Sequence, residues 1–156
     1  MLENIIKDRD FALLMQRNIQ DLMLHFFSKN QHFGILCDLE HVTFEPELPQ
    51  DIKNEFRAMT LFFLAGYTFE TAKIENDYVI FEAGFGPDNI GSVVSVPLLS
   101  ILQIIVEETP VLINLASPFP KEPLFQEQSI DEKGVEHSIS SFLSNPENAA
   151  FLNKDN

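Results

Sequence analysis

The side chains best suited to metal binding or nucleophilic chemistry lie close together in one part of this chain. They are His32, Cys37, Asp38 and His41. If these residues form a strand, alternation places Cys37 and His41 on one face and Asp38 on the other. The segment has neither a C-x-x-C nor an H-x-x-x-H spacing, and Cys37 lacks an electropositive setting that would activate its thiolate. We therefore expect a buried thiol and a loop histidine, with no metal site and no cofactor.

Two further patterns contain the residue types of a phosphate loop or of a catalytic carboxylate pair. Gly84-Phe85-Gly86 is followed by proline, aspartate and an expected strand, whereas a phosphate loop opens into a helix and offers a lysine. Glu45 with Glu47, and Glu107 with Glu108, stand where loops or element ends place solvated acids. A G-x-S-x-G nucleophile motif is absent from the sequence. We expect no catalytic residue and predict that the protein is not an enzyme.

The composition describes a folded, acidic chain with a restricted set of partners. Of its 156 residues 45% are hydrophobic, and the formal net charge is −14. Nucleic acids and anionic membranes attract basic surfaces, so neither is an expected partner. No apolar run approaches the length of a membrane span, and the first residues lack the basic character of a signal peptide. The single cysteine suits a reducing compartment, so we expect a cytoplasmic protein.

The apolar pattern near the N-terminus predicts a long amphipathic helix over residues 10–29, with Asp10 as its N-cap. One face repeats at steps of one, three or four residues. Its members are Phe11, Leu14, Met15, Ile19, Leu22, Met23 and Phe26. Leu13, Leu24 and Phe27 make the stripe broader than one core contact needs. The face either covers its own domain or packs on a second copy, which would make these seven residues a homodimer interface.

Beyond residue 32 the pattern changes to short strands separated by turns. We expect strands over residues 33–39, 60–65, 69–74, 78–85, 92–96 and 111–116. Asn76-Asp77 predicts a hairpin turn, because both residue types tolerate a positive φ. A short helix is expected around Ile52 and Phe56, and a second over residues 98–106, which Pro97 would begin. The fold class is therefore α+β, mainly β, as a strand meander behind a long N-terminal helix.

The chain divides by composition into a domain and a tail. Residues 1–116 hold 7 basic and 17 acidic residues, a net charge of −10. Residues 117–156 carry three prolines near their start and little apolar content, which predicts a flexible acidic tail. The chain holds fifteen phenylalanines and no tryptophan. Alternating strands cannot hide all of them, and an apolar groove for an extended peptide would use such a surplus.

One stretch of the sequence resembles a known family. Residues 76–86, NDYVIFEAGFG, and residues 94–98, VSVPL, are similar to motifs of the stringent starvation protein B family, whose members are adaptors that deliver tagged substrates to the ClpXP protease. The resemblance extends over roughly residues 11–116. It implies a small open β-barrel of SH3- or Sm-like topology that dimerises through its N-terminal helix. It also implies a groove for a C-terminal ssrA-type degradation tag, with ClpX as a candidate partner.

Carried over by position, the resemblance assigns the peptide-binding wall to one loop and the strand start after it. The implied residues are Ala65, Gly66, Tyr67, Thr68 and Phe69, with Phe81 and Phe85 beneath or alongside.

Two features depart from the family pattern. The chain ends in FLNKDN, without the short basic-hydrophobic motif that docks on ClpX. The groove region also lacks the arginines that family members often place there, since Lys73 is the only base between residues 58 and 120. An acidic groove disfavours an acidic tag, so we expect apolar or basic peptides as cargo.

Two other function classes stay open at this point. A small, acidic, dimeric secretion chaperone would bind an unfolded partner segment, although its signature is a long C-terminal helix and four prolines stand against one after residue 117. A small hot-dog-type enzyme would need a buried helix at residues 98–106 and a positioned acid or base.

Overall fold

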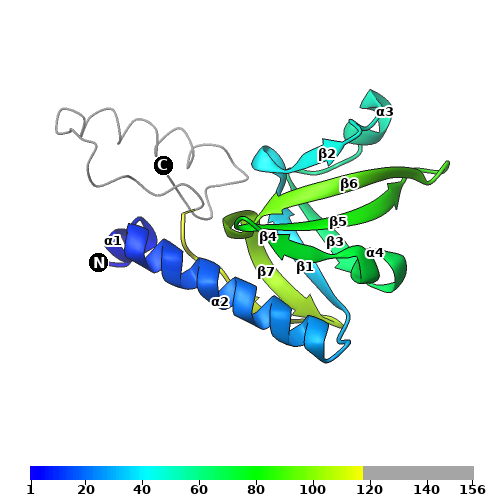
Figure 1. Cartoon of the computed structure of the whole chain (residues 1–156). Coiled ribbons are helices and arrows are strands. Elements are labelled where there is room, and N and C mark those ends of the chain that lie inside the picture. The colour runs from blue at the N-terminus through cyan, green and yellow to red at the C-terminus, as the bar shows by residue number, and fades with distance from the viewer. Residues whose placement is uncertain (118–156) are drawn as a thin grey trace. The chain divides into compact units, whose positions relative to one another are not determined.

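Eight antiparallel strands form two four-stranded sheets within residues 1–117, the part that this computed structural model describes (Figure 1). The first sheet has the order β3-β1-β7-β8 and the second the order β2-β6-β5-β4. The strands are β1 (Phe33–Asp38), β2 (Thr43–Glu45), β3 (Met59–Leu64), β4 (Lys73–Glu75), β5 (Tyr78–Phe85), β6 (Ile90–Pro97), β7 (Ile101–Val106) and β8 (Thr109–Ile113). The α+β class and the N-terminal helix are confirmed, and the two sheets do not close into a barrel.

The helices are α1 (Leu2–Ile6), α2 (Arg9–Ser28), α3 (Gln50–Lys53) and α4 (Gly66–Thr71), with 3-10 turns at Leu39–His41 and Leu98–Ser100. The helix predicted over residues 10–29 is therefore confirmed within one residue at each end. Its N-cap prediction is wrong, because Asp8 and not Asp10 accepts the hydrogen bond from the Phe11 amide, at 2.9 Å. Asp10 is the second residue of the helix, where its negative charge interacts favourably with the N-terminal end of the helix dipole.

The chain groups into two units, and the boundary between them falls within α2. The described part of the first unit contains Met1–Asn18 and residues 114–117, and in it the Ser117 amide donates to the Ile6 carbonyl at 3.0 Å. The second unit, Ile19–Ile113, contains both sheets. The tail was expected over residues 117–156, and all of it except Ser117 lies outside the described part of the chain.

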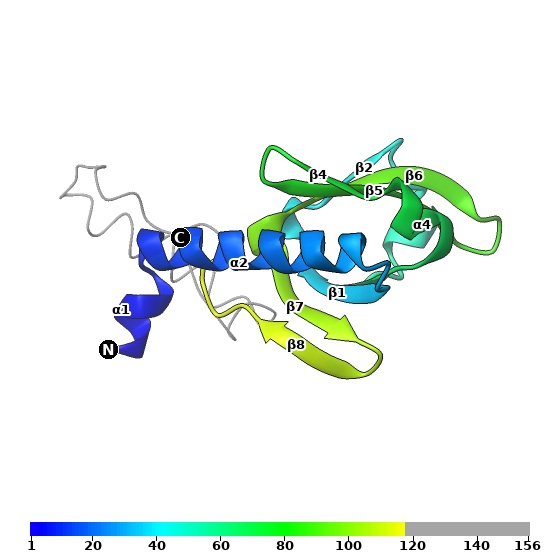
Figure 2. The same cartoon turned by 60° about the horizontal axis from the view of Figure 1, so that its bottom comes forward.

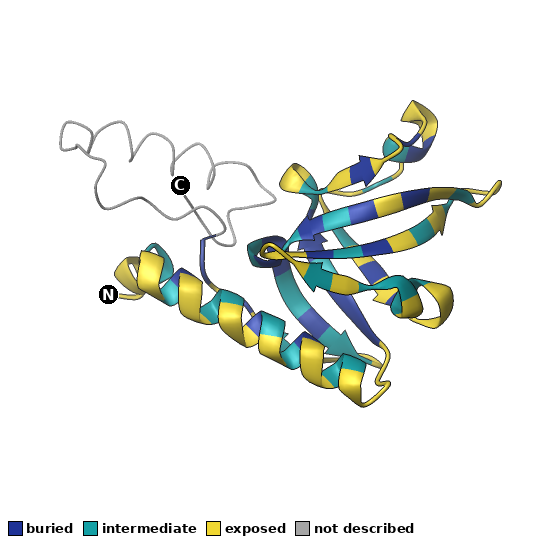
Figure 3. Ribbon diagram, viewed as in Figure 1, coloured by how far each residue is buried: buried dark blue, intermediate teal, exposed yellow. Residues whose placement is uncertain are grey.

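The core of the second unit takes apolar side chains from both sheets and from the last part of α2. The fully buried large members are Ile19, Met23, Ile35, Leu64, Val79, Phe81, Val94, Leu98, Ile101 and Ile104. On β5 and β6 buried and exposed residues alternate, as expected for strands with one face on the core (Figure 3). Burial of these side chains, at roughly 25 cal/mol per Å² of apolar surface, is the main favourable contribution to this fold.

More of the described phenylalanines pack in the interior than the sequence predicts. Phe62 meets Phe81 and Phe85 with ring centroids 5.6 and 6.4 Å apart, while Phe44 meets Phe56 and Phe85 at 5.7 Å each. Such contacts add to the energy of area burial. Among the described residues, these five phenylalanines are therefore absorbed by aromatic clusters, whereas Phe63 stays 64% exposed.

The segment 98–106 is a 3-10 turn followed by strand β7, so the predicted helix is wrong. β7 pairs with β1 on one side and with β8 on the other. β7 and β8 form the hairpin visible in Figure 2. Opposite β1, Cys37 faces Ile101 and Leu36 faces Gln103, which leaves Leu102 as a bulged extra residue. The bulge lets Ile101 and Ile104 both point into the core. This produces the step of three that resembles a helical period.

Two other predicted boundaries need correction. Residues 66–71 form helix α4 where a strand over 69–74 was expected, and only Lys73–Glu75 pairs with β5. The last strand is Thr109–Ile113, with Pro110 inside it, because β8 is an edge strand that tolerates a missing amide donor. The Asn76-Asp77 turn is confirmed, with φ values of 52° and 68°.

Candidate functional site

The outer face of the second sheet carries a row of side chains whose neighbours are set by strand register. Glu45 of β2 and Glu82 of β5 are both paired with Val93 of β6, which lies between them. All three residues are exposed, whereas Phe81 and Val94, one position along, are buried. Because alternate strand residues point to opposite faces, the two glutamates and the valine share the outer surface of the sheet.

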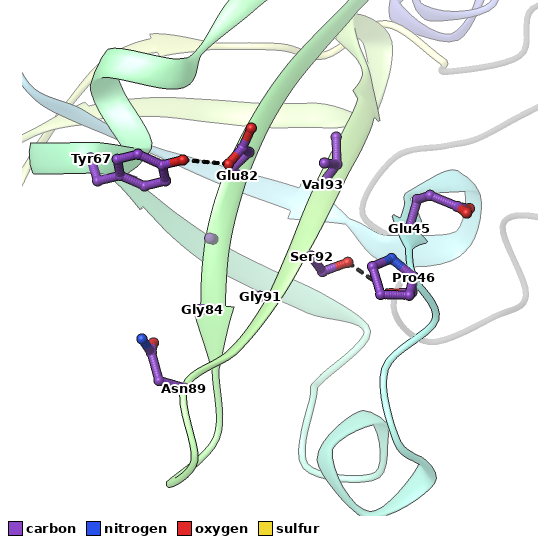
Figure 4. Close-up of a pocket in the computed structure, with 10 residues that line it drawn as sticks. Glu45, Pro46, Tyr67, Glu82, Gly84, Asn89, Gly91, Ser92 and Val93 are labelled. Atoms are coloured by element: carbon purple, nitrogen blue, oxygen red, sulfur yellow. Dashed lines mark hydrogen bonds between the residues drawn. The ribbon is translucent and has the colours of Figure 1, made fainter.

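A pocket of about 330 Å³ opens on this face. It is lined by Glu45, Pro46, Tyr67, Glu82, Ala83, Gly84, Asn89, Gly91, Ser92 and Val93. In Figure 4 Tyr67 extends from α4 toward Glu82 on one side, and Glu45 with Pro46 stands on the other side of β6. Gly84 and Gly91 are direct partners across β5 and β6, so this pair of positions adds no side chain to the outer face. The bare Gly91 position leaves open space in the pocket, whereas the Asn89 side chain lies over Gly84.

Helix α4 is tied to β5 by two hydrogen bonds. The Tyr67 hydroxyl donates to Glu82 Oε1 at 2.6 Å, and the Glu82 amide donates to Thr71 Oγ1 at 3.0 Å. The hydrogen bond to Glu82, together with the negative charge of that carboxylate, raises the pKa of Tyr67 above its usual value. Tyr67 is therefore a neutral phenol at physiological pH, held beside a carboxylate at one wall of the pocket.

The opposite wall is also fixed by a hydrogen bond. Ser92 is buried, and its hydroxyl donates to the Pro46 carbonyl at 2.9 Å. This contact holds the residue that follows β2 against β6, outside the ladder between the two strands. Both walls of the pocket are thus positioned by bonds to the central strands of the sheet, which favours a pre-formed site.

The two glycines at the base of the pocket tolerate substitution differently. A Cβ atom at Gly84 would collide with the side-chain amide of Asn89, whereas a Cβ at Gly91 would meet nothing within 4 Å. Gly91 therefore faces open space inside the pocket. A small side chain at this position would begin in open space, because its Cβ meets no neighbouring atom.

The structure separates the residues that the resemblance assigns to one peptide-binding wall. Tyr67 lines the pocket on the second sheet, but Gly66 and Phe69 line another hollow of about 510 Å³ together with Phe27 and His32. Ala65 is exposed directly before α4, and Thr68 is half-buried within it. Phe81 is only 1% exposed and therefore cannot touch a ligand, and Phe85 packs partly buried against the core.

Sequence reasoning missed the half of the pocket that comes from β2 and β6. Glu45 and Pro46 were expected in a loop, and Asn89 in a turn that precedes the strand expected over residues 92–96. The Cα partners Glu45, Val93 and Glu82 are far apart in sequence. Nothing local in the sequence marks that proximity.

The predicted interface face of α2 is partly internal. Ile19 and Met23 have no exposed surface and belong to the core of the second unit. The prediction that these two residues lie in a dimer interface is therefore wrong. Leu22 and Phe26 pack partly buried against the same core. Of the seven residues, Leu14 is the one classed as exposed, at 55%, while Phe11 and Met15 are half-buried.

The residues considered for metal or nucleophile chemistry do not assemble into such a site. Among residues 1–117 no three histidine, cysteine or acidic side chains are placed to hold a metal ion together. Burial raises the pKa of the Cys37 thiol well above its usual value, with a further contribution from the charge of Asp38. A buried, protonated thiol is a packing residue and a poor nucleophile.

Neither protein-family models nor curated proteins match this chain. Within the part described here, no helix has both the length and the apolar character needed to cross a bilayer.

Proposed function

We propose that this protein is a non-enzymatic adaptor that binds an extended peptide on the outer face of its second sheet. The observation that carries the proposal is the pocket between Tyr67 and Glu45, whose walls are fixed to the central strands by hydrogen bonds. It lies beside α4, next to the segment where the resemblance to the stringent starvation protein B family implies a tag-binding groove.

The geometry supports peptide binding over small-molecule chemistry. The pocket is open, mixed in polarity and built from strand faces and a short helix, so it can hold one side chain of a longer ligand. The two hydroxyl groups of the lining are engaged within the protein, since Ser92 donates to the Pro46 carbonyl and Tyr67 donates to Glu82. The hot-dog alternative required a helix at residues 98–106, and β7 occupies most of that segment.

In this proposal the bound peptide is the degradation tag of a substrate protein, and the adaptor brings that protein to an AAA+ protease of the ClpXP type. Residues 118–156 would make the contact with ClpX. A homodimer formed through exposed leucines of α2, among them Leu14 and Leu24, would present two pockets and two tails.

Fluorescence anisotropy with labelled extended peptides tests the proposal. We would compare an acidic ssrA-type peptide, an apolar peptide and a basic peptide on the full chain. We expect saturable binding of the apolar or basic peptide at micromolar concentration and weaker binding of the acidic one. If the folded protein binds none of the three at tens of micromolar, peptide recognition is wrong.

A degradation assay then tests delivery. A folded reporter that carries the best-binding peptide should be degraded faster by ClpXP when the full chain is added. A variant truncated after residue 117 should bind the peptide and fail to accelerate degradation. If a pull-down instead yields one secreted protein and no protease subunit, the secretion chaperone alternative replaces the adaptor.

A further inference from the structure

The pocket on the second sheet is bordered by two carboxylates that have no basic partner among the described residues. The lysines of the neighbouring segments form ion pairs with other acids. Lys53 pairs with Glu47 and Lys73 pairs with Glu75, so neither pairs with Glu45 or Glu82. The nearest base in sequence to Glu82 is Lys73, which is already 3.6 Å from Glu75. Within residues 1–117, therefore, no basic side chain neutralises the negative charge at the pocket.

Strand register places these carboxylates on opposite sides of an apolar floor. Glu45 and Glu82 are both partners of Val93, and adjacent strands lie roughly 4.8 Å apart. Their backbones are thus separated by two strand spacings, roughly 10 Å, across β6. Val93 and the bare Gly91 position lie between and below them. This spacing admits one extended side chain between the two acids.

Tyr67 determines which carboxylate oxygen of Glu82 is available to a ligand. Its hydroxyl occupies Oε1 of Glu82, which leaves Oε2 as an acceptor. Tyr67 as a whole residue is 64% exposed and lines the pocket. An exposed aromatic ring beside a free carboxylate oxygen favours a flat, positively charged group that can stack on the ring and donate to the oxygen.

We propose that this pocket holds one basic side chain of the bound peptide, with arginine preferred over lysine. The aliphatic stem would lie over Val93, and the guanidinium would donate hydrogen bonds to Glu82 beside the Tyr67 ring. The negative charge of Glu45, on the other side of β6, would add a longer-range attraction. An acidic side chain would be repelled by both carboxylates. This inference rests on the proposed function, because it names the side chain that a peptide ligand places in the pocket.

A peptide series with one variable position tests the proposal. Host peptides that differ only in Arg, Lys, Ala or Glu at that position are titrated against the full chain by anisotropy. We expect the Arg peptide to bind roughly tenfold or more tightly than the Ala peptide, because charge-assisted hydrogen bonds contribute more than neutral ones. The Glu peptide should bind most weakly, and the Arg preference should shrink as salt is raised.

Charge-neutral variants locate the preference. Glu82→Gln, Glu45→Gln and the double variant keep the shape of the pocket and remove its charge. The double variant should reduce the Arg-to-Ala ratio to near one. Glu108→Gln, at the exposed turn between β7 and β8 on the other sheet, is the matched control and should leave the ratio unchanged. Circular dichroism checks that each variant is folded.

The outcomes separate the two proposals. If peptides bind with equal affinity whatever the variable residue, or if the Arg preference survives in the double variant, the basic-residue pocket is wrong and peptide binding stands. If no peptide of the series binds the folded protein, both proposals fall.

Discussion

The hydroxyl of Tyr67 on α4 donates a 2.6 Å hydrogen bond to Glu82 Oε1 on β5, fifteen residues further along the chain. This bond places an aromatic ring at one wall of a pocket whose opposite wall carries Glu45. It also makes the phenol a reporter of the charge at the site, because the neutral form of Tyr67 is the one that donates to the carboxylate.

The ionisation of Tyr67 should occur at a higher pH than that of a free tyrosine. Since the folded-state pKa is raised above the unfolded one, the stabilisation from this bond is complete below the unfolded pKa. It is lost as pH rises through the folded pKa. The chain has two tyrosines, so Tyr78→Phe leaves Tyr67 as the only chromophore that titrates near 295 nm. Adding Glu82→Gln should lower the Tyr67 pKa toward 10.0, its ordinary value. An unchanged titration would contradict the bond.

Filling the pocket at Gly91 should block ligand binding and leave the fold intact. Gly91→Val adds a side chain where nothing lies within 4 Å of the new Cβ. We expect thermal stability to stay close to that of the unmodified chain, and peptide affinity to fall roughly tenfold or more, the scale of about 1.4 kcal/mol. Gly84→Val is the comparison, because its Cβ would collide with Asn89 and should also lower the stability. Unchanged peptide affinity in folded Gly91→Val would place the binding site elsewhere.

A buried and an exposed phenylalanine among the described residues should differ strongly in their contribution to stability. Phe81 is 1% exposed and contacts the ring of Phe62, whereas Phe63 is 64% exposed on edge strand β3. Phe81→Ala should cost about 3–5 kcal/mol of unfolding free energy through cavity formation. Phe63→Ala should change it by about 0.5 kcal/mol or less. Urea denaturation measures both, and equal losses would contradict the assignment of Phe81 to the core.

The proposed homodimer can be tested with one charge on α2. Leu14 is 55% exposed, and Leu14→Asp should convert the dimer to monomers in sedimentation velocity at micromolar concentration while the helix content is retained. Ile113→Asp adds the same charge to an equally exposed residue of β8 and should leave the dimer intact. Dissociation by Ile113→Asp alone would move the interface to the first sheet. A monomeric unmodified chain would remove the dimer from the proposal.

Local sequence features predicted the elements that depend on neighbouring residues. The helix over residues 10–29 was found because its apolar side chains recur at helical spacing. The hairpin at Asn76-Asp77 was found because these two residue types adopt positive φ at low cost. The same locality explains the failure at residues 98–106, where a bulge at Leu102 gave a strand the spacing of a helix.

The sequence by itself determined the composition of residues 117–156, the acidity and the single cysteine. It also determined the long helix, the Asn76-Asp77 hairpin and the alternation along β5. The pairing of β2 with β6 was decided by the tertiary structure, because register joins residues that no local pattern relates. That pairing brings Glu45 to the pocket of Tyr67 and Glu82. Likewise, only packing decided that Ile19 and Met23 fill the core while Leu14 stays exposed, since one amphipathic stripe can serve either use.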